Sequence, residues 1–294
     1  MTISRTYHDV EGSVYILPAD KAETERLSLQ HRVLTRSFRD RLWTAPLDIQ
    51  QLEGADVLDN ATGSGAWLFD LAKRCKDAGV TAGHLIGTDM TDKQFPQLKL
   101  QDVGAKSDGA PSLQIANALA LPKEWTNRFT LAHQRLLTFA LTASEWPRCL
   151  SELHRVIKPG GYVELSETAH TLFKYPIGTP GDRFVQQHLF PLMDHLGLSK
   201  VLPTTMEEML IEAGFVDVRI VEVDIPLNEK RGAEAKEASR NFHDAFCAFS
   251  EAVVKAGLVS ADETGHRALI DAVRNQWNRE DVHHKFVAWS ARKP

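Results

Sequence analysis

Hydrophobic and polar positions alternate with two different periods along this chain of 294 residues. Short runs rich in aliphatic and β-branched residues predict strands, whereas longer stretches with apolar positions three or four residues apart predict helices. Helical stretches separate the first strands, which is typical of a parallel sheet covered by helices. The predicted strands are 55–59, 84–89, 112–116, 128–133, 161–166, 216–225 and 285–291.

Three segments have clear helical spacing. Residues 20–43 predict a long first helix, because Asp20 and Glu23 form a capping-box pattern at its start. Residues 66–78 and 145–157 predict two further helices, each lying between predicted strands. The pattern therefore predicts an α/β domain with an additional helix in front of it.

The chain divides into an arm and a larger domain. We expect residues 1–50 to form an N-terminal helical arm or lid, and residues 51–294 to form one α/β domain. Two largely helical insertions, at about 173–198 and 231–277, interrupt the end of the predicted sheet. Their aromatic side chains could line a pocket for a small molecule, or they could belong to the core.

Composition and charge are those of an ordinary globular protein. Hydrophobic residues make up 43% and charged residues 25%, and the formal net charge is −5. A negative chain has no overall attraction to nucleic acid or anionic lipid, so we expect neither as a partner. The start, Met1 to Val10, lacks the apolar core of a secretory signal, and no apolar run is long enough to span a bilayer. We therefore expect a soluble, cytoplasmic protein.

Cysteine and histidine positions do not indicate a metal centre. The three cysteines, Cys75, Cys149 and Cys247, are far apart, and no Cys-x-x-Cys pair or His/Cys cluster accompanies them. We expect them to be reduced residues of the core, because free cysteine is among the most buried residue types. No metal ligand is predicted.

A loop with two glycines directly follows the first predicted strand. The strand ends at Asp59, Gly63 and Gly65 follow, and a predicted helix begins at Ala66. In an open α/β sheet a nucleotide-like ligand binds at such a turn, because small residues let the backbone approach it and the helix dipole faces it. Such turns are also common connectors, so the loop alone leaves both interpretations open.

The residues around these glycines argue against a dinucleotide ligand. The dinucleotide fingerprint needs a third small residue where this chain has Leu68, beside the bulky Trp67. Asp59 instead suits a ligand with an ammonium group, since a carboxylate pairs with a cation. The predicted cofactor-binding residues of this segment are Asp59, Asn60, Ala61, Gly63 and Gly65.

Polar residues also follow the second and third predicted strands. Asp89 is placed to accept hydrogen bonds from both hydroxyls of a ribose, and Met90 to lie against an adenine ring. Asn117, with Ala118 beside it, is placed to bond the edge of that adenine. The alternatives are that Asp89 caps a turn and that Asn117 is a turn former.

Three residues near the fourth and fifth strands are candidates for proton transfer or pocket formation. His133 is our first candidate for a general base, because imidazole exchanges protons near neutral pH. His133 and the adjacent Gln134 could instead only shape the cofactor pocket. Glu167 is the second candidate base, and it could equally be a carboxylate at a strand end in water.

Five short segments of the chain together carry a resemblance to known proteins. They are Tyr15 to Asp20, the loop Asp59 to Trp67, His133-x-Arg135, Trp146-Pro147, and Lys158-Pro159-Gly160-Gly161-Tyr162-Val163-Glu164. Taken together they resemble the class I S-adenosylmethionine-dependent methyltransferases, and more narrowly a group of fungal methyltransferases associated with secondary metabolism. The resemblance covers about residues 13–170 well and the remainder in outline.

The resemblance implies a doubly wound, mostly parallel, seven-stranded Rossmann-like methyltransferase sheet with a helical arm and helical lid insertions. It implies that the loop holds the methionine part of S-adenosylmethionine, Asp89 the ribose, and Asn117 with Ala118 the adenine. The arm, including Tyr15, would cover cofactor and substrate. Ala61 stands where the family usually has glycine, and alanine keeps the close backbone approach if its φ is negative.

We therefore expect an enzyme that moves a methyl group from S-adenosylmethionine to a small-molecule acceptor and leaves S-adenosylhomocysteine. The resemblance favours O- or N-methylation of a secondary metabolite, by a monomer or a homodimer. The rivals are a cofactor-binding regulatory or scaffold protein, and a cyclase or isomerase of the same fold that transfers no methyl group. An NAD-dependent oxidoreductase is a further rival, against which the loop sequence argues.

Overall fold

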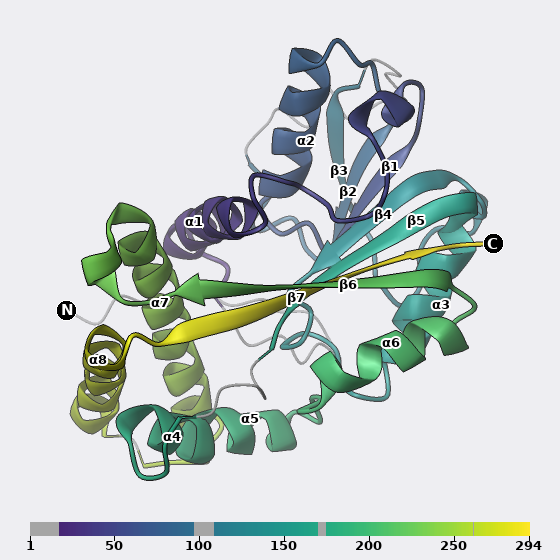
Figure 1. Ribbon diagram of the computed structural model, residues 1–294. Coiled ribbons are helices and arrows are strands. Elements are labelled where there is room, and N and C mark those ends of the chain that lie inside the picture. The colour runs from purple at the N-terminus through teal and green to yellow at the C-terminus, as the bar shows by residue number, and fades with distance from the viewer. Residues whose placement is uncertain (1–17, 97–108, 170–174, 261) are drawn as a thin grey trace.

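Seven strands form the centre of the computed structural model, which describes residues 18–96, 109–169, 175–260 and 262–294. Their order across the sheet is β3-β2-β1-β4-β5-β7-β6 (Figure 1). β7 runs antiparallel to its two neighbours, and the other pairings are parallel. The predicted strands and the α/β fold class are therefore confirmed. The strands are β1 (Val57–Asn60), β2 (Leu85–Asp89), β3 (Pro111–Ile115), β4 (Phe129–Arg135), β5 (Ile157–Thr168), β6 (Val216–Pro226) and β7 (His283–Arg292).

The strand order reverses direction at β1. β2 and β3 lie on one side of β1, and β4 and β5 lie on the other. Asp59 of β1 lies beside Gly87 of β2 and beside His133 of β4. In doubly wound sheets the ligand crevice opens outside the carboxyl ends of the strands at such a reversal. The loop after β1 therefore lies at the expected position for a bound cofactor.

The first helix, α1 (Lys21–Ser37), begins as predicted but ends earlier. Its N-cap is Asp20, whose carboxylate accepts a hydrogen bond from the Glu23 N–H at 3.0 Å. The prediction that the helix continues to Trp43 is wrong, because the two residues Arg39 and Asp40 adopt φ values of 57° and 60°. The Arg74 guanidinium donates to the Asp40 carbonyl at 2.6 Å and so fixes this left-handed turn.

Helices cover the sheet. α2 (Ala66–Asp77) and α3 (Trp146–Val156) match their predicted ranges closely, and α6 (Leu202–Glu212) was not predicted. The buried face of α3 consists of Trp146, Cys149, Leu150, Leu153 and Val156, as its helical spacing requires. Short 3-10 helices occupy Ile49–Leu52, Lys123–Trp125 and Glu229–Arg231.

Both predicted insertions are helical where the structure describes them. The first holds α4 (Pro180–Phe184), the π-helical turn η5 (Val185–Leu189) and α5 (Phe190–His195). The second holds α7 (Ala233–Lys255) and α8 (Glu263–Glu280). In Figure 1 the helices α4, α7 and α8 gather near the carboxyl end of β6 and the start of β7.

The aromatic residues of these insertions form a core. The rings of Phe184 and Phe246 stack with centroids 4.3 Å apart, and Trp277 packs edge-on against Phe246. Phe242 and Phe249 are buried in the same cluster. Of the two interpretations of these aromatic side chains, core packing is therefore the one observed for the residues that the structure describes. Within the described ranges, no helix is both long and apolar enough to cross a bilayer.

Candidate cofactor and active site

The loop between β1 and α2 turns sharply through residues with positive φ. Gly63 and Gly65 have φ values of 56° and 75°, and a Cβ atom on Gly65 would lie 2.7 Å from the Phe69 ring. Ala61 has a φ of 55°. A negative φ at Ala61 was our condition for a close backbone approach to the cofactor, and this condition is not met. Alanine here holds a backbone conformation that glycine adopts more readily.

Asp59 is buried at the centre of the site. Its Oδ1 lies 2.7 Å from His133 Nδ1, and its Oδ2 accepts a hydrogen bond from the Thr62 hydroxyl. Both Asp59 and His133 are only 2% exposed. Since a carboxylate only accepts hydrogen bonds, we assign the His133 proton to Nδ1. This arrangement fixes the direction of the Asp59 carboxylate at the carboxyl end of β1.

His133 is held on a second side by Trp67. The two rings are parallel with centroids 3.9 Å apart, and the Trp67 indole N–H donates to the Leu42 carbonyl at 2.9 Å. Burial lowers the pKa of His133, against the opposing effect of its hydrogen bond to Asp59. A neutral, stacked imidazole positions Asp59 well, and the role of His133 as a general base stays a prediction.

Asp89 connects the end of β2 to the loop. Its Oδ2 accepts a hydrogen bond from the Gly63 N–H at 2.9 Å. Burial raises the pKa of Asp89 to about 6, and the nearby Asp59 carboxylate acts in the same direction. Both carboxylates are thus brought to one loop. The ribose contact of Asp89 and the adenine contact of Met90 stay predictions.

Asn60 and Gln134 belong to a buried hydrogen-bond network beneath the loop. The Asn60 amide donates to Gln134 Oε1 at 2.7 Å, and the Thr88 hydroxyl donates to Asn60 Oδ1 at 3.0 Å. The Cys149 thiol, whose pKa is raised by burial to about 12, also donates to Gln134 Oε1. These side chains join β1, β2, β4 and α3. Sequence reasoning missed Thr88 and Cys149, because such contacts link distant positions.

Asn117 forms the turn that follows β3. Its side-chain oxygen accepts a hydrogen bond from the Leu119 N–H at 2.8 Å, and its backbone bridges to Ala120. The turn-forming alternative is therefore observed for the oxygen atom of Asn117. Ala118 is buried beside it. The adenine contacts of Asn117 and Ala118 stay predictions.

Glu167 is fully buried near the end of β5. Its carboxylate accepts hydrogen bonds from the Leu137 N–H at 2.9 Å, the Thr138 N–H at 3.1 Å and the Thr138 hydroxyl at 2.7 Å. Burial raises its pKa to about 7. The alternative of a carboxylate in water is therefore wrong. Glu167 ties the segment after β4 to β5, and its role as a base stays a prediction.

A second buried glutamate, Glu164, ends one of the segments that carry the family resemblance, but it was not predicted as a site residue. Its carboxylate accepts hydrogen bonds from the Thr44 N–H at 2.7 Å, the Ala45 N–H at 3.0 Å and the Thr44 hydroxyl at 3.2 Å. Burial raises its pKa to about 8. Glu164 thereby holds the segment after α1 over β5, although no local pattern in the sequence indicates this contact.

The arm is packed against the rest of the molecule where the structure describes it. Arg26, which is buried, donates to both carboxylate oxygens of Glu23 and to Asn241 of α7. His31 Nε2 lies 3.1 Å from Asp70 Oδ2, and burial lowers the pKa of His31 to about 4. Tyr15 lies outside the described residues, so its predicted cofactor contact stays a prediction.

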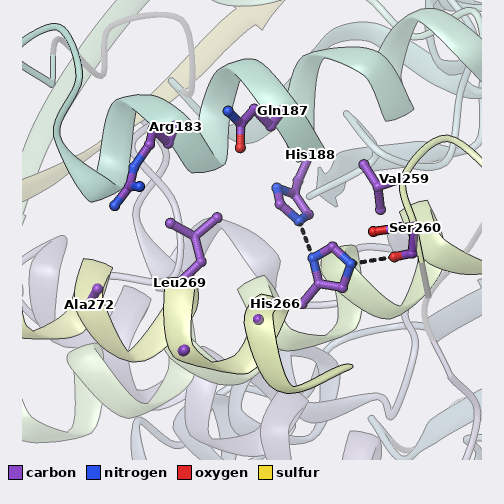
Figure 2. A pocket seen from close by; sticks show the side chains of 10 residues that line it. Arg183, Gln187, His188, Val259, Ser260, His266, Leu269 and Ala272 are labelled. Carbon is purple, nitrogen blue, oxygen red and sulfur yellow. Dashed lines mark hydrogen bonds between the residues drawn. The ribbon is translucent and has the colours of Figure 1, made fainter. Parts of the chain in front are cut away.

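A separate hollow of about 760 Å³ lies between η5 and α8 (Figure 2). His188 Nε2 lies 2.8 Å from His266 Nδ1, and His266 Nε2 lies 2.7 Å from the Ser260 carbonyl. Burial lowers the pKa of His188 to about 4, with a smaller effect from His266. None of the residues that line this hollow belongs to the loop after β1, so it is distinct from the predicted cofactor site.

Comparisons with known proteins agree with this geometry. Residues 57–161 match the family model described as a methyltransferase domain. This segment begins with β1 and continues into β5, so it contains the loop, Asp59, Asp89 and His133. The fold, the loop and the family match together identify residues 57–161 as a methyltransferase domain of the class I type. The expected recognition, enzyme class and cofactor, S-adenosylmethionine, are thereby confirmed.

Within this class the chain is similar to fungal proteins over nearly its whole length. It is 28% identical to methyltransferase pytC of Aspergillus terreus, covering 99% of this chain and 86% of the relative. It is 27% identical to N-methyltransferase sirN of Leptosphaeria maculans, covering 92% and 90%. It is 23% identical to secondary metabolism regulator LAE1 of Cochliobolus heterostrophus, covering 100% and 94%.

A solved structure has the same fold. Geranyl diphosphate methyltransferase in complex with SAM superimposes with a TM-score of 0.50 at 13% identity, covering 94% of this chain and 92% of that chain. At this identity the likeness shows the fold alone. It agrees with the Rossmann-like sheet described above.

Proposed function

We propose that the protein transfers the methyl group of S-adenosylmethionine to an oxygen or nitrogen atom of a small-molecule secondary metabolite. The observation that carries the proposal is the meeting of Asp59 and Asp89 at one loop, where Gly65 leaves no room for a side chain. The relatives named as methyltransferases support the reaction, and the relative named as a regulator of secondary metabolism supports the biological setting.

The residues present fit the cofactor. The Asp59 carboxylate would pair with the ammonium of the methionine part, and the Asp89 carboxylate would accept from the ribose hydroxyls. Gly63 and Gly65, with φ values of 56° and 75°, let the loop turn sharply at the carboxyl end of β1, where a nucleotide-like ligand binds in such sheets. When bound, the cofactor supplies a methyl group that is already activated by its sulfonium.

The remaining work of the chain is to position the acceptor and exclude water. For methyl transfer the acceptor atom must lie close to the methyl group and in line with the bond that breaks. The arm and the segment held by Glu164 cover this side of the sheet and so reduce access of solvent. His133 is held by Asp59 and Trp67, which keeps the floor of the site rigid.

The proposal is tested with methyl-labelled S-adenosylmethionine and a fungal metabolite extract. We expect label to move into the organic small-molecule fraction with the wild-type protein. The Asp59→Asn variant, which keeps the shape of the site, should transfer much less. If the protein binds the labelled cofactor and no fraction of the extract becomes labelled, methyl transfer to a small molecule is contradicted.

A second candidate function is regulation through cofactor binding without methyl transfer to a metabolite. The likeness to a relative named as a secondary metabolism regulator, over the full length of this chain, favours it. This candidate predicts binding of the labelled cofactor together with an unlabelled small-molecule fraction. The same experiment therefore separates the two functions.

A further inference from the structure

Arg135 stands at the last position of β4, two residues beyond His133 on the same face of the sheet. Asn60 of β1 lies beside Gln134, so Arg135 is level with Ala61 of the cofactor loop. Its neighbour on the other side is Ser166 of β5. Arg135 thus lies at the edge of the sheet where the acceptor must approach.

The guanidinium of Arg135 has no hydrogen bond or ion pair with any residue that the structure describes. Burial lowers its pKa, and the attraction of the Asp59 and Asp70 carboxylates opposes this effect without direct contact. Arg26 shows the usual arrangement of a buried arginine in this chain, since it donates to Glu23 and Asn241. The five donors of this partly buried cation need acceptors, which solvent or a bound ligand can provide.

The Ser166 hydroxyl also has no partner within the part of the chain that the structure describes. Its side-chain oxygen is buried, the residue is 7% exposed, and this atom makes no hydrogen bond to any described residue. Arg135 and Ser166 line the same cavity of about 20 Å³. Two neighbouring side chains therefore present unused donors to one small space.

The size and walls of this cavity limit what can enter. A volume of about 20 Å³ accommodates one water-sized group. Aromatic side chains of Phe38, Trp43 and Trp67 form part of the wall. A single oxygen atom attached to a flat, unsaturated skeleton fits this description, with the rest of the molecule lying outside the cavity.

The charges around the cavity favour a negative oxygen. Its titratable and charged lining residues besides Arg135 are Arg41, which is exposed at the surface, His133 and Glu164. Burial lowers the pKa of His133 and raises the pKa of Glu164 to about 8, so both tend towards the neutral form. Two arginines are then the charges that the lining presents at neutral pH, and the Asp59 and Asp70 carboxylates, which attract Arg135, lie outside the lining.

We propose that Arg135 and Ser166 bind the acceptor as an anion, and that the acceptor is an acidic hydroxyl compound, a phenol or an enol, held in its deprotonated form. This inference rests on the proposed function and narrows it to O-methylation. The acceptor hydroxyl releases its proton to solvent, stabilised as the oxyanion by Arg135. A lone pair of that oxygen forms the new O–CH3 bond while the S–CH3 bond breaks. The electron pair of the broken S–CH3 bond stays on sulfur.

This assignment explains how the site works without a dedicated base. A guanidinium beside the hydroxyl favours the ionised form, as an opposite charge does for any acid. His133 is then free to orient Asp59, to which its Nδ1 is bonded. Arg135 would be a residue that touches the substrate, and Ser166 would add a second hydrogen bond to the same oxygen.

The test uses 4-nitrophenol, whose phenolate has its own visible absorption band, and the full chain saturated with S-adenosylhomocysteine. At a pH slightly below the pKa of the free probe, we expect wild-type protein to increase the phenolate band in a saturable way. Arg135→Gln should weaken phenolate binding at least about tenfold, and Arg135→Lys should retain part of it. 4-Nitroanisole, which cannot ionise, should not compete.

Three measurements separate this proposal from a structural role. Arg219→Gln changes an exposed arginine on β6 and should leave the phenolate band unchanged. Each variant should also bind S-adenosylhomocysteine with wild-type affinity, measured by calorimetry on the same preparation. Arg135→Gln should melt at or above the wild-type temperature, because it removes a poorly solvated charge.

The proposal is overturned if wild-type protein does not increase the phenolate band, or if Arg135→Gln increases it equally. A lower melting temperature of Arg135→Gln with loss of cofactor binding would also overturn it, since Arg135 would then be structural. Failure of the wild-type protein to bind S-adenosylhomocysteine would contradict the proposed function instead, and the two failures are therefore distinguishable.

Discussion

Replacing Asp59 by asparagine is expected to weaken binding of the cofactor while leaving the fold intact. Asparagine has the same shape, so its oxygen can accept the hydrogen bond from His133 and its amide can donate to the Thr62 hydroxyl. The contacts within the protein therefore survive, and we expect the free energy of unfolding to change by less than about 1 kcal/mol.

The loss in binding follows from the charge. A hydrogen bond to an ionised group contributes about 1.5 to 3 kcal/mol, and about 1.4 kcal/mol corresponds to a factor of ten in affinity. If Asp59 pairs with the ammonium of the methionine part, Asp59→Asn should weaken S-adenosylhomocysteine binding roughly 10- to 100-fold. 5′-Methylthioadenosine lacks that ammonium, so its affinity should be unchanged.

Calorimetric titration of both ligands measures this difference directly. Asp56→Asn is the matched control: it changes a carboxylate three positions earlier, which accepts from Arg128 at 2.6 Å and lies away from the loop. The control should lower the melting temperature and leave both affinities unchanged. The reasoning is refuted if Asp59→Asn affects the two ligands equally, or affects neither.

Three further predictions concern stability and the loop. Above pH 6.5 we expect the melting temperature to fall, because Glu167 and Glu164 have native pKa values of about 7 and 8, above the ordinary 4.5, and lose protons that the unfolded chain has already lost. Below pH 6.5 the glutamates and histidines such as His188, with a native pKa of about 4, act in opposite directions, because falling pH favours the protonated native glutamates and the protonated unfolded histidines; a melting temperature that does not fall between pH 6.5 and 8 would contradict the prediction. Gly65→Ala, at a φ of 75° and with its Cβ 2.7 Å from an aromatic ring, should destabilise the protein by roughly 2 kcal/mol in a denaturant titration, and an unchanged midpoint would show that the loop relaxes freely. Asp89→Asn should weaken adenosine binding about tenfold or more in a competition assay, and equal affinity would argue against a ribose contact.

Periodicity predicted the strands well because most of them are buried by helices. Val57 to Asn60 is buried at every position, and its apolar start, Val57-Leu58, marks the strand although Asp59 and Asn60 are polar. The end of α1 was mispredicted because Arg39 and Asp40 take left-handed conformations that an Arg74 contact from α2 fixes. The helix propensity of residues 38–43 cannot show a contact with a residue more than 30 positions away.

The candidate site, like the fold, could be predicted from the sequence only in part. Asp59, the glycines and Asp89 follow strand ends, so their meeting could be predicted from the topology of an α/β sheet. The partners of Glu164 and Glu167 lie 29 to 120 residues away, and only the folded chain shows that both carboxylates are buried. The positive φ of Ala61 was also hidden, because alanine normally indicates a negative φ.

The central claim is that the loop from Asp59 to Trp67 binds S-adenosylmethionine. Titration calorimetry of the wild-type chain with S-adenosylhomocysteine, and separately with NAD, tests it most directly. We predict saturable binding of one S-adenosylhomocysteine per chain and no binding of NAD. Absence of S-adenosylhomocysteine binding, or tighter binding of NAD, would contradict it.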